Sequence, residues 1–137
     1  MKTNPYQQYK QTQIQTASQD KLILMLFDGA IKFVNQGKLA LKEEKYDKAN
    51  ECLKRAQDIV AEFMASLNFD AGEIANNLYV LYDYIHRRLI EANINKDTGI
   101  LDEVNNMLNN LKDTWIQVFE KVKEQQIKQN GGLEIDK

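Results

Sequence analysis

The sequence is poor in residues that interrupt helices and in residues that cross-link a chain. Its 137 residues include one proline, six glycines, one cysteine and one histidine. So little proline and glycine argues against an all-β or loop-rich fold. The lone cysteine, Cys52, excludes an internal disulfide and suits a reducing compartment. No secretory leader is recognisable, so we expect a cytoplasmic protein.

The chain also lacks a strong charge of one sign and a long apolar run. Its net charge of −2 argues against nucleic acid as the main partner. Lysines and acids are interspersed, so no polybasic membrane patch is present. The longest apolar run, Leu22 to Phe27, is far too short to span a bilayer. We therefore expect one domain, no nucleic-acid partner and no membrane insertion.

Apolar residues recur every three or four positions in four stretches, which is the period of an amphipathic helix. The first stretch begins near Ser18, a good N-cap, and the second covers about residues 47–67. The third begins at Asp70, with Glu73 three residues later as in a capping box. The fourth follows the cap Asp97, and its apolar stripe continues to Val122.

Short links between long helices favour antiparallel neighbours. We therefore predict an all-α fold, an elongated antiparallel four-helix bundle over residues 18–127. Residues 1–17 form a separate N-terminal segment that contains no acidic residue, and residues 128–137 form a tail containing Asn130-Gly131-Gly132. We expect both ends to be mobile.

The sequence offers no positive sign of catalysis, cofactor binding or metal binding. His86 and Asp83 resemble half of a di-iron motif, but no second histidine exists to complete the site. A histidine phosphotransfer domain using His86 is an alternative, with Arg87 and Arg88 near the phosphate. Ile90 would crowd the approach of a receiver domain, and His86 also fits a simple partner for Asp83.

Several residues fit partner binding as well as they fit a role in folding. The helix after Asp70 has more apolar surface than one packing seam needs, with Tyr79 and Tyr84 beside its stripe. Gly29 lies within the first helix, where it fits either close helix packing or a groove that admits another helix. Gly37 fits a helix end or bend. A generic helical adaptor remains a further reading.

The sequence resembles the flagellar secretion chaperone FliS family over about residues 4–120. Four stretches carry the resemblance: Asn4-Pro5-Tyr6 through Tyr9; Thr16-Ala17-Ser18 leading into Lys21-Leu22; Leu26 through Ala30; and Ser66-Leu67-Asn68 with Leu78-Tyr79 and Arg87-Arg88-Leu89. The chain departs from the family pattern at Gln19-Asp20, where Pro-Glu is frequent, and at Phe27, where tyrosine is frequent.

The resemblance implies a non-enzymatic export chaperone in the cytoplasm. Such proteins bind the disordered C-terminal segment of flagellin, prevent its early polymerisation and deliver it to the export gate component FlhA. The amino-terminal segment covers part of the binding surface in the family, a role that falls here on Tyr6 and Tyr9. We expect the groove to include Ile23, Phe27, Gly29, Tyr79 and Tyr84, and the protein to be a monomer or weak homodimer.

Overall fold

The computed structural model describes the backbone of residues 5–135 and the side chains of residues 19–129. Four long helices and one short 3₁₀-helix account for nearly all of this part of the chain. They are α1 (Pro5–Lys42), α2 (Tyr46–Ala65), η1 (Phe69–Ala71), α3 (Glu73–Asn95) and α4 (Thr98–Ile135). The predicted all-α class is confirmed.

The chain divides into two compact units, and the larger one comprises residues 26–110. In this unit each helix contacts the next in a closed ring. Asn50 bonds to Asn93 across α2 and α3, while Lys38 pairs with Asp102 across α1 and α4. Arg88 bonds to Glu103 across α3 and α4 at 2.8 Å. The unit is therefore a four-helix bundle.

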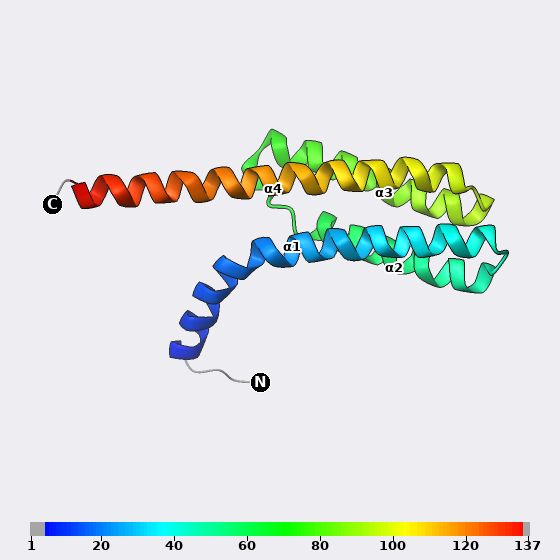
Figure 1. Ribbon diagram of the computed structural model, residues 1–137, viewed down its shortest axis with the longest axis horizontal. Helices are drawn as coiled ribbons and strands as arrows, with labels where there is room; N and C mark the ends of the chain where they lie inside the picture. The colour runs from blue at the N-terminus through cyan, green and yellow to red at the C-terminus, as the bar shows by residue number, and fades with distance from the viewer. Residues whose placement is uncertain (1–4, 136–137) are drawn as a thin grey trace. The chain divides into compact units, whose positions relative to one another are not determined.

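Neighbouring helices in this bundle are antiparallel. Residues 29 and 37 of α1 lie beside residues 59 and 53 of α2, so one number rises as the other falls. The same holds between α1 and α4, where Asn35 bonds to Asn105 and Lys38 pairs with Asp102. The ammonium of Lys96 lies 4.4 Å from the centre of the Tyr46 ring, which places the α1–α2 and α3–α4 links at the same end, as Figure 1 shows.

The core of the bundle follows the predicted stripes. Its largest fully buried side chains come from all four helices: Tyr82, Phe27, Leu53, Ile85, Leu89, Leu101, Leu108, Val34, Val60 and Val104. Burying each large apolar side chain contributes about 1.5–3 kcal/mol to stability. Burial of the apolar stripes against one another therefore drives the four helices to assemble into a bundle.

The helix boundaries differ from the predictions at three places. Helix α1 continues through Ser18 to Pro5, because glutamines and lysines favour helix and proline is well tolerated in a first helical turn. Helix α4 continues past residue 127 to Ile135. Helix α3 begins at Glu73 rather than Asp70, because Asn68 caps η1 by accepting a hydrogen bond from the Asp70 amide at 3.0 Å. The predicted cap Asp97 is confirmed, since its Oδ1 accepts from the amides of Gly99 and Ile100.

The second unit comprises the beginning of α1, up to Met25, and the end of α4, from Leu111. The apolar stripe of α4 remains buried as far as Leu111, whereas Val118 and Val122 are 40% and 47% exposed. The rings of Trp115 and Phe119 lie 5.5 Å apart on this part of α4. Within the described residues, no helix is long and apolar enough to cross a membrane.

Candidate functional site

A column of three aromatic rings occupies the core of the bundle. Phe27 of α1 stacks on Phe63 of α2 with ring centres 4.4 Å apart, and Phe63 stacks on Tyr82 of α3 at 5.4 Å. Such pairs add about 0.5–1.5 kcal/mol beyond their burial. Phe27, predicted to line a groove, is 0% exposed. The structure therefore places its ring beneath the surface, where it supports the helices without being accessible.

The two glycines of α1 have different surroundings. A Cβ at Gly29 would lie 3.5 Å from Cδ1 of Ile59, which is an ordinary contact. A Cβ at Gly37 would lie only 2.6 Å from Cδ2 of Leu53. The close approach of α1 and α2 therefore requires Gly37, which is buried in mid-helix and does not mark a helix end. Gly29 is half-buried and leaves α1 accessible beside Ile59.

Tyr79 lies on the surface, together with two apolar residues that were not predicted from the sequence. Its side chain is 40% exposed, and its ring lies 5.8 Å from that of Phe69. Phe69 is 51% exposed and Val80 is 64% exposed. Val80 lies off the core stripe of α3, and Phe69 precedes that helix. These positions outside the stripe could have predicted from the sequence that both side chains are exposed. The beginning of α3 and η1 thus present a small exposed apolar surface.

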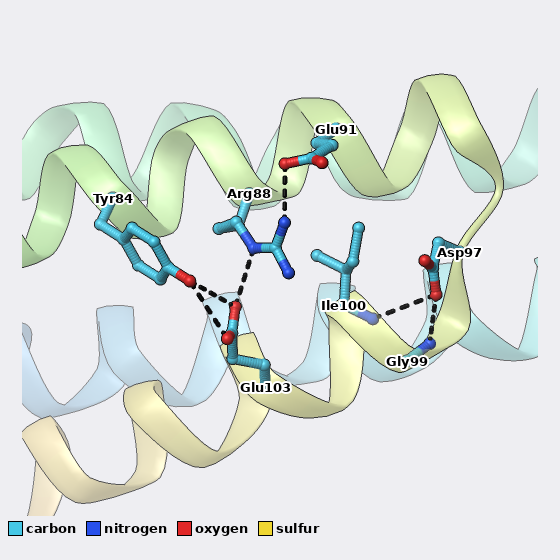
Figure 2. A network of polar contacts seen from close by, with 7 residues as sticks. All are labelled: Tyr84, Arg88, Glu91, Asp97, Gly99, Ile100 and Glu103. Atoms are coloured by element: carbon cyan, nitrogen blue, oxygen red, sulfur yellow. Dashed lines mark hydrogen bonds and ion pairs between the residues drawn. The ribbon is translucent and has the colours of Figure 1, made fainter.

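Tyr84, in contrast, is held by polar contacts between α3 and α4. Its hydroxyl donates to the two carboxylate oxygens of Glu103 at 3.0 and 3.1 Å. Arg88 donates to Glu103 at 2.8 Å and to Glu91 at 2.7 Å. Figure 2 shows the Glu103 carboxylate between the phenol and the guanidinium, with Asp97 capping α4 nearby. Tyr84 therefore ties two helices together.

The same contacts shift the ionisation of all three groups. The hydrogen bond from Arg88, followed by that from Tyr84, lowers the pKa of Glu103 despite its partial desolvation. The hydrogen bond to Glu103 raises the pKa of Tyr84, and the bonds to Glu103 and Glu91 raise the pKa of Arg88. The network is thus charged on Glu103 and Arg88 and neutral on Tyr84 at neutral pH.

The remaining predicted site residues lie outside the bundle unit. Ile23 is half-buried and belongs to the unit that contains the beginning of α1. Tyr6 and Tyr9 lie in the helical backbone of α1, but their side chains fall outside the described residues. Among the predicted residues whose side chains are described, no hydrogen bond or ring contact joins one to another.

Among the described side chains, His86 does not form the ion pair with Asp83 that the sequence suggested. It is half-buried on α3, and Asp83 pairs with Arg87 at 3.0 Å. Among the residues whose side chains are described, no group of three or more histidine, cysteine or carboxylate side chains is placed to hold a metal ion.

Comparison with known proteins agrees with the fold. The family model described as flagellar protein FliS matches residues 2–122. The chain is 37% identical to the flagellar secretion chaperone FliS of Bacillus subtilis, over 85% of this chain and 87% of the relative. It is 37% identical to the FliS of Salmonella typhimurium, over 79% and 82% of the two chains.

Among solved structures, one described as a flagellar chaperone from bacteria has a TM-score of 0.74. It covers 85% of this chain and 95% of its own, and at 22% identity it supports the fold alone. The family match and the relatives agree with the resemblance in the sequence, and the expectation that the chain is not an enzyme is confirmed by its family. The chain therefore belongs to the FliS family of flagellar secretion chaperones.

Proposed function

We propose that this chaperone binds the disordered C-terminal segment of flagellin in the cytoplasm. It covers that segment until export, prevents premature polymerisation and brings flagellin to the export gate component FlhA. The match to the family over residues 2–122 carries the proposal. Exposed apolar side chains support it, because a folded monomer rarely leaves contiguous apolar surface without a use.

Two parts of the structure have suitable surface, each within its own unit. In the bundle, Phe69, Tyr79 and Val80 are exposed, and Gly29 leaves part of α1 accessible beside Ile59. In the other unit, Val118 and Val122 continue the stripe of α4 outside any core, and Leu22 and Met25 are exposed on α1. An unfolded segment that forms amphipathic helices on binding would match such surfaces.

The rigid core suits a chaperone that works without a nucleotide. Binding a disordered segment releases energy from apolar burial but loses the entropy of ordering the segment, so the net affinity is moderate and reversible. The tied helices keep the surface in place, so the ordering cost falls mainly on the segment.

The direct test is a calorimetric titration of the full chain with a synthetic peptide of the last 40 or so residues of the organism's flagellin. We expect saturable binding with a negative heat-capacity change, the sign of apolar burial. A peptide of the same composition in scrambled order is the control. If the native peptide gives no saturable heat, or if the scrambled peptide binds equally well, the proposal is wrong.

A further inference from the structure

Charge is distributed unevenly along the bundle. Between Arg55 and His86 the sequence contains no lysine or arginine, and its only charged residues are acidic: Asp58, Glu62, Asp70, Glu73 and Asp83. This stretch includes the end of α2, η1 and the beginning of α3. This stretch is therefore negative where the exposed apolar residues Phe69, Tyr79 and Val80 occur.

Acidic and apolar side chains share one face of α3. Glu73, Asn76, Val80 and Asp83 recur at steps of three and four, which places them on the same side of the helix. Tyr79 adjoins this side and reaches the ring of Phe69, which precedes Asp70 in the chain. We name the set Phe69, Asp70, Glu73, Tyr79 and Val80 the Tyr79 face.

The two carboxylates of the Tyr79 face are available. Asp83 is already paired with Arg87, but Asp70 and Glu73 form no ion pair within the described residues. Both are exposed. Exposed carboxylates beside an apolar surface favour a partner whose apolar residues are flanked by cations.

We propose that the Tyr79 face receives an unfolded protein segment whose apolar residues are bordered by lysine or arginine. The inference rests on the proposed function, since it names the chemistry of the segment that the chaperone covers. The apolar side chains of the segment pack on Phe69, Tyr79 and Val80, while its cations lie against Asp70 and Glu73. These charges set orientation and selectivity more than total affinity.

The probes are three synthetic 20-residue peptides that share one pattern of leucine and isoleucine and differ only in the flanking residues, which are lysine, glutamine or glutamate. With the full chain at about 0.05 M salt, the lysine peptide should bind about tenfold tighter than the glutamate peptide. The preference should decrease at about 0.5 M salt, where screening is strong. Equal binding of the two, or no binding by any of the three, overturns the inference.

Two pairs of variants locate the effect. Neutralising the face with Asp70→Asn and Glu73→Gln should abolish the lysine preference. The matched control, Glu44→Gln with Asp47→Asn, makes the same change in net charge around the start of α2 and should keep it. Val80→Lys should weaken the lysine peptide strongly, whereas Ile94→Lys, at a 73% exposed position of the same helix, should not. A preference that survives in the Asp70→Asn, Glu73→Gln chain contradicts the proposal.

The flagellin peptide separates this inference from the proposed function. If it fails to bind the unaltered chain, the proposed function is wrong, whatever the designed peptides do. If it binds and the designed peptides show no charge preference, the function stands and only the Tyr79 face is wrong.

Discussion

Gly29 and Gly37 are eight residues apart on α1, yet only one of them is required by packing. At Gly37 a methyl group would meet Leu53, which is fully buried and has little room to move. At Gly29 it would make an ordinary contact with Ile59. The sequence left Gly29 open between close helix packing and a groove and suggested a helix end or bend at Gly37, whereas the structure places the close helix contact at Gly37. The same residue type therefore marks a helix contact at one position and accessible surface at the other.

We predict that Gly37→Ala lowers the free energy of unfolding by about 1–2 kcal/mol, because overpacking costs more than the gain in helix propensity. Gly29→Ala should raise it by up to about 1 kcal/mol, since only the propensity gain applies. Urea unfolding of the two variants and the unaltered chain measures both. Equal stability of the two variants would contradict the packing derived for Gly37.

At the scale of elements, the bundle is held differently at its two ends. Near the two helix links, polar contacts cross the seams: Lys38 with Asp102, Asn50 with Asn93, and Lys96 over Tyr46. Towards η1, the helices are joined by the stack of Phe27, Phe63 and Tyr82. Polar contacts depend on hydrogen-bond geometry, whereas the aromatic stack depends on burial. The network around Glu103 is the group of contacts that shifts pKa values, those of Tyr84, Arg88 and Glu103.

The network should make stability depend on pH in a defined direction. Because the pKa of Glu103 is lowered in the folded chain, its stabilising effect is present above the ordinary value of 4.5 and is lost as pH falls through the folded pKa. Glu103→Gln keeps the shape but loses the charge, so it should lower the melting temperature by a few degrees at pH 7. The difference between the two proteins should shrink below about pH 4.5.

Thermal unfolding from pH 3 to 8 checks this dependence, with Glu120→Gln, an exposed change elsewhere on α4, as the control. At alkaline pH the change in stability comes from Tyr84, whose pKa is raised above 10.0 by its hydrogen bond to Glu103. The stability that this bond contributes is therefore lost as pH rises through the pKa of Tyr84 in the folded chain. A difference between Glu103→Gln and the unaltered chain that stays constant down to pH 3 would exclude the proposed role of the carboxylate.

At the scale of the whole chain, the residues with predicted roles are distributed over two compact units. Residues 26–110 contain the aromatic core, the Glu103 network and the Tyr79 face. The first and last helices each extend beyond this unit, and Val118 and Val122 lie exposed on the extension of α4. Tyr6 and Tyr9, which the family resemblance predicts to cover part of the binding surface as a lid, belong to the extension of α1.

Deleting residues 1–15 tests the proposed lid. The largest fully buried side chains of the core all lie within residues 26–110, so the shortened chain should keep its helicity and its urea transition. If Tyr6 and Tyr9 cover the binding surface, the shortened chain should associate with the flagellin peptide faster, because no segment has to be displaced. Stopped-flow fluorescence and circular dichroism give the two measurements. Unchanged association and dissociation rates would remove the lid from the proposal.

Much of the fold was accessible from the sequence because helix formation and core selection depend on local periodicity. Leu53, Val60 and Phe63 lie in the second predicted helical stretch and Leu101, Val104 and Leu108 in the fourth, and all six are buried. Asp97 caps α4 as predicted. The ends of α1 and α4 were placed wrongly, because a cap-like serine or a glycine pair does not stop a helix whose other residues favour it.

The candidate site was harder to predict from the sequence, because the exposure of a side chain depends on which other helix covers it. Phe27 and Tyr79 are both aromatic residues in helices, but Phe27 lies under Phe63 and Tyr79 remains exposed. Tyr84 links α3 to α4 because α4 places the Glu103 carboxylate within hydrogen-bond distance of its hydroxyl. The sequence by itself determined four helices, their order and their buried stripes, since these follow from spacing along one chain. Only the tertiary structure decided which glycine and which tyrosines meet a neighbour, since that depends on the distance between helices.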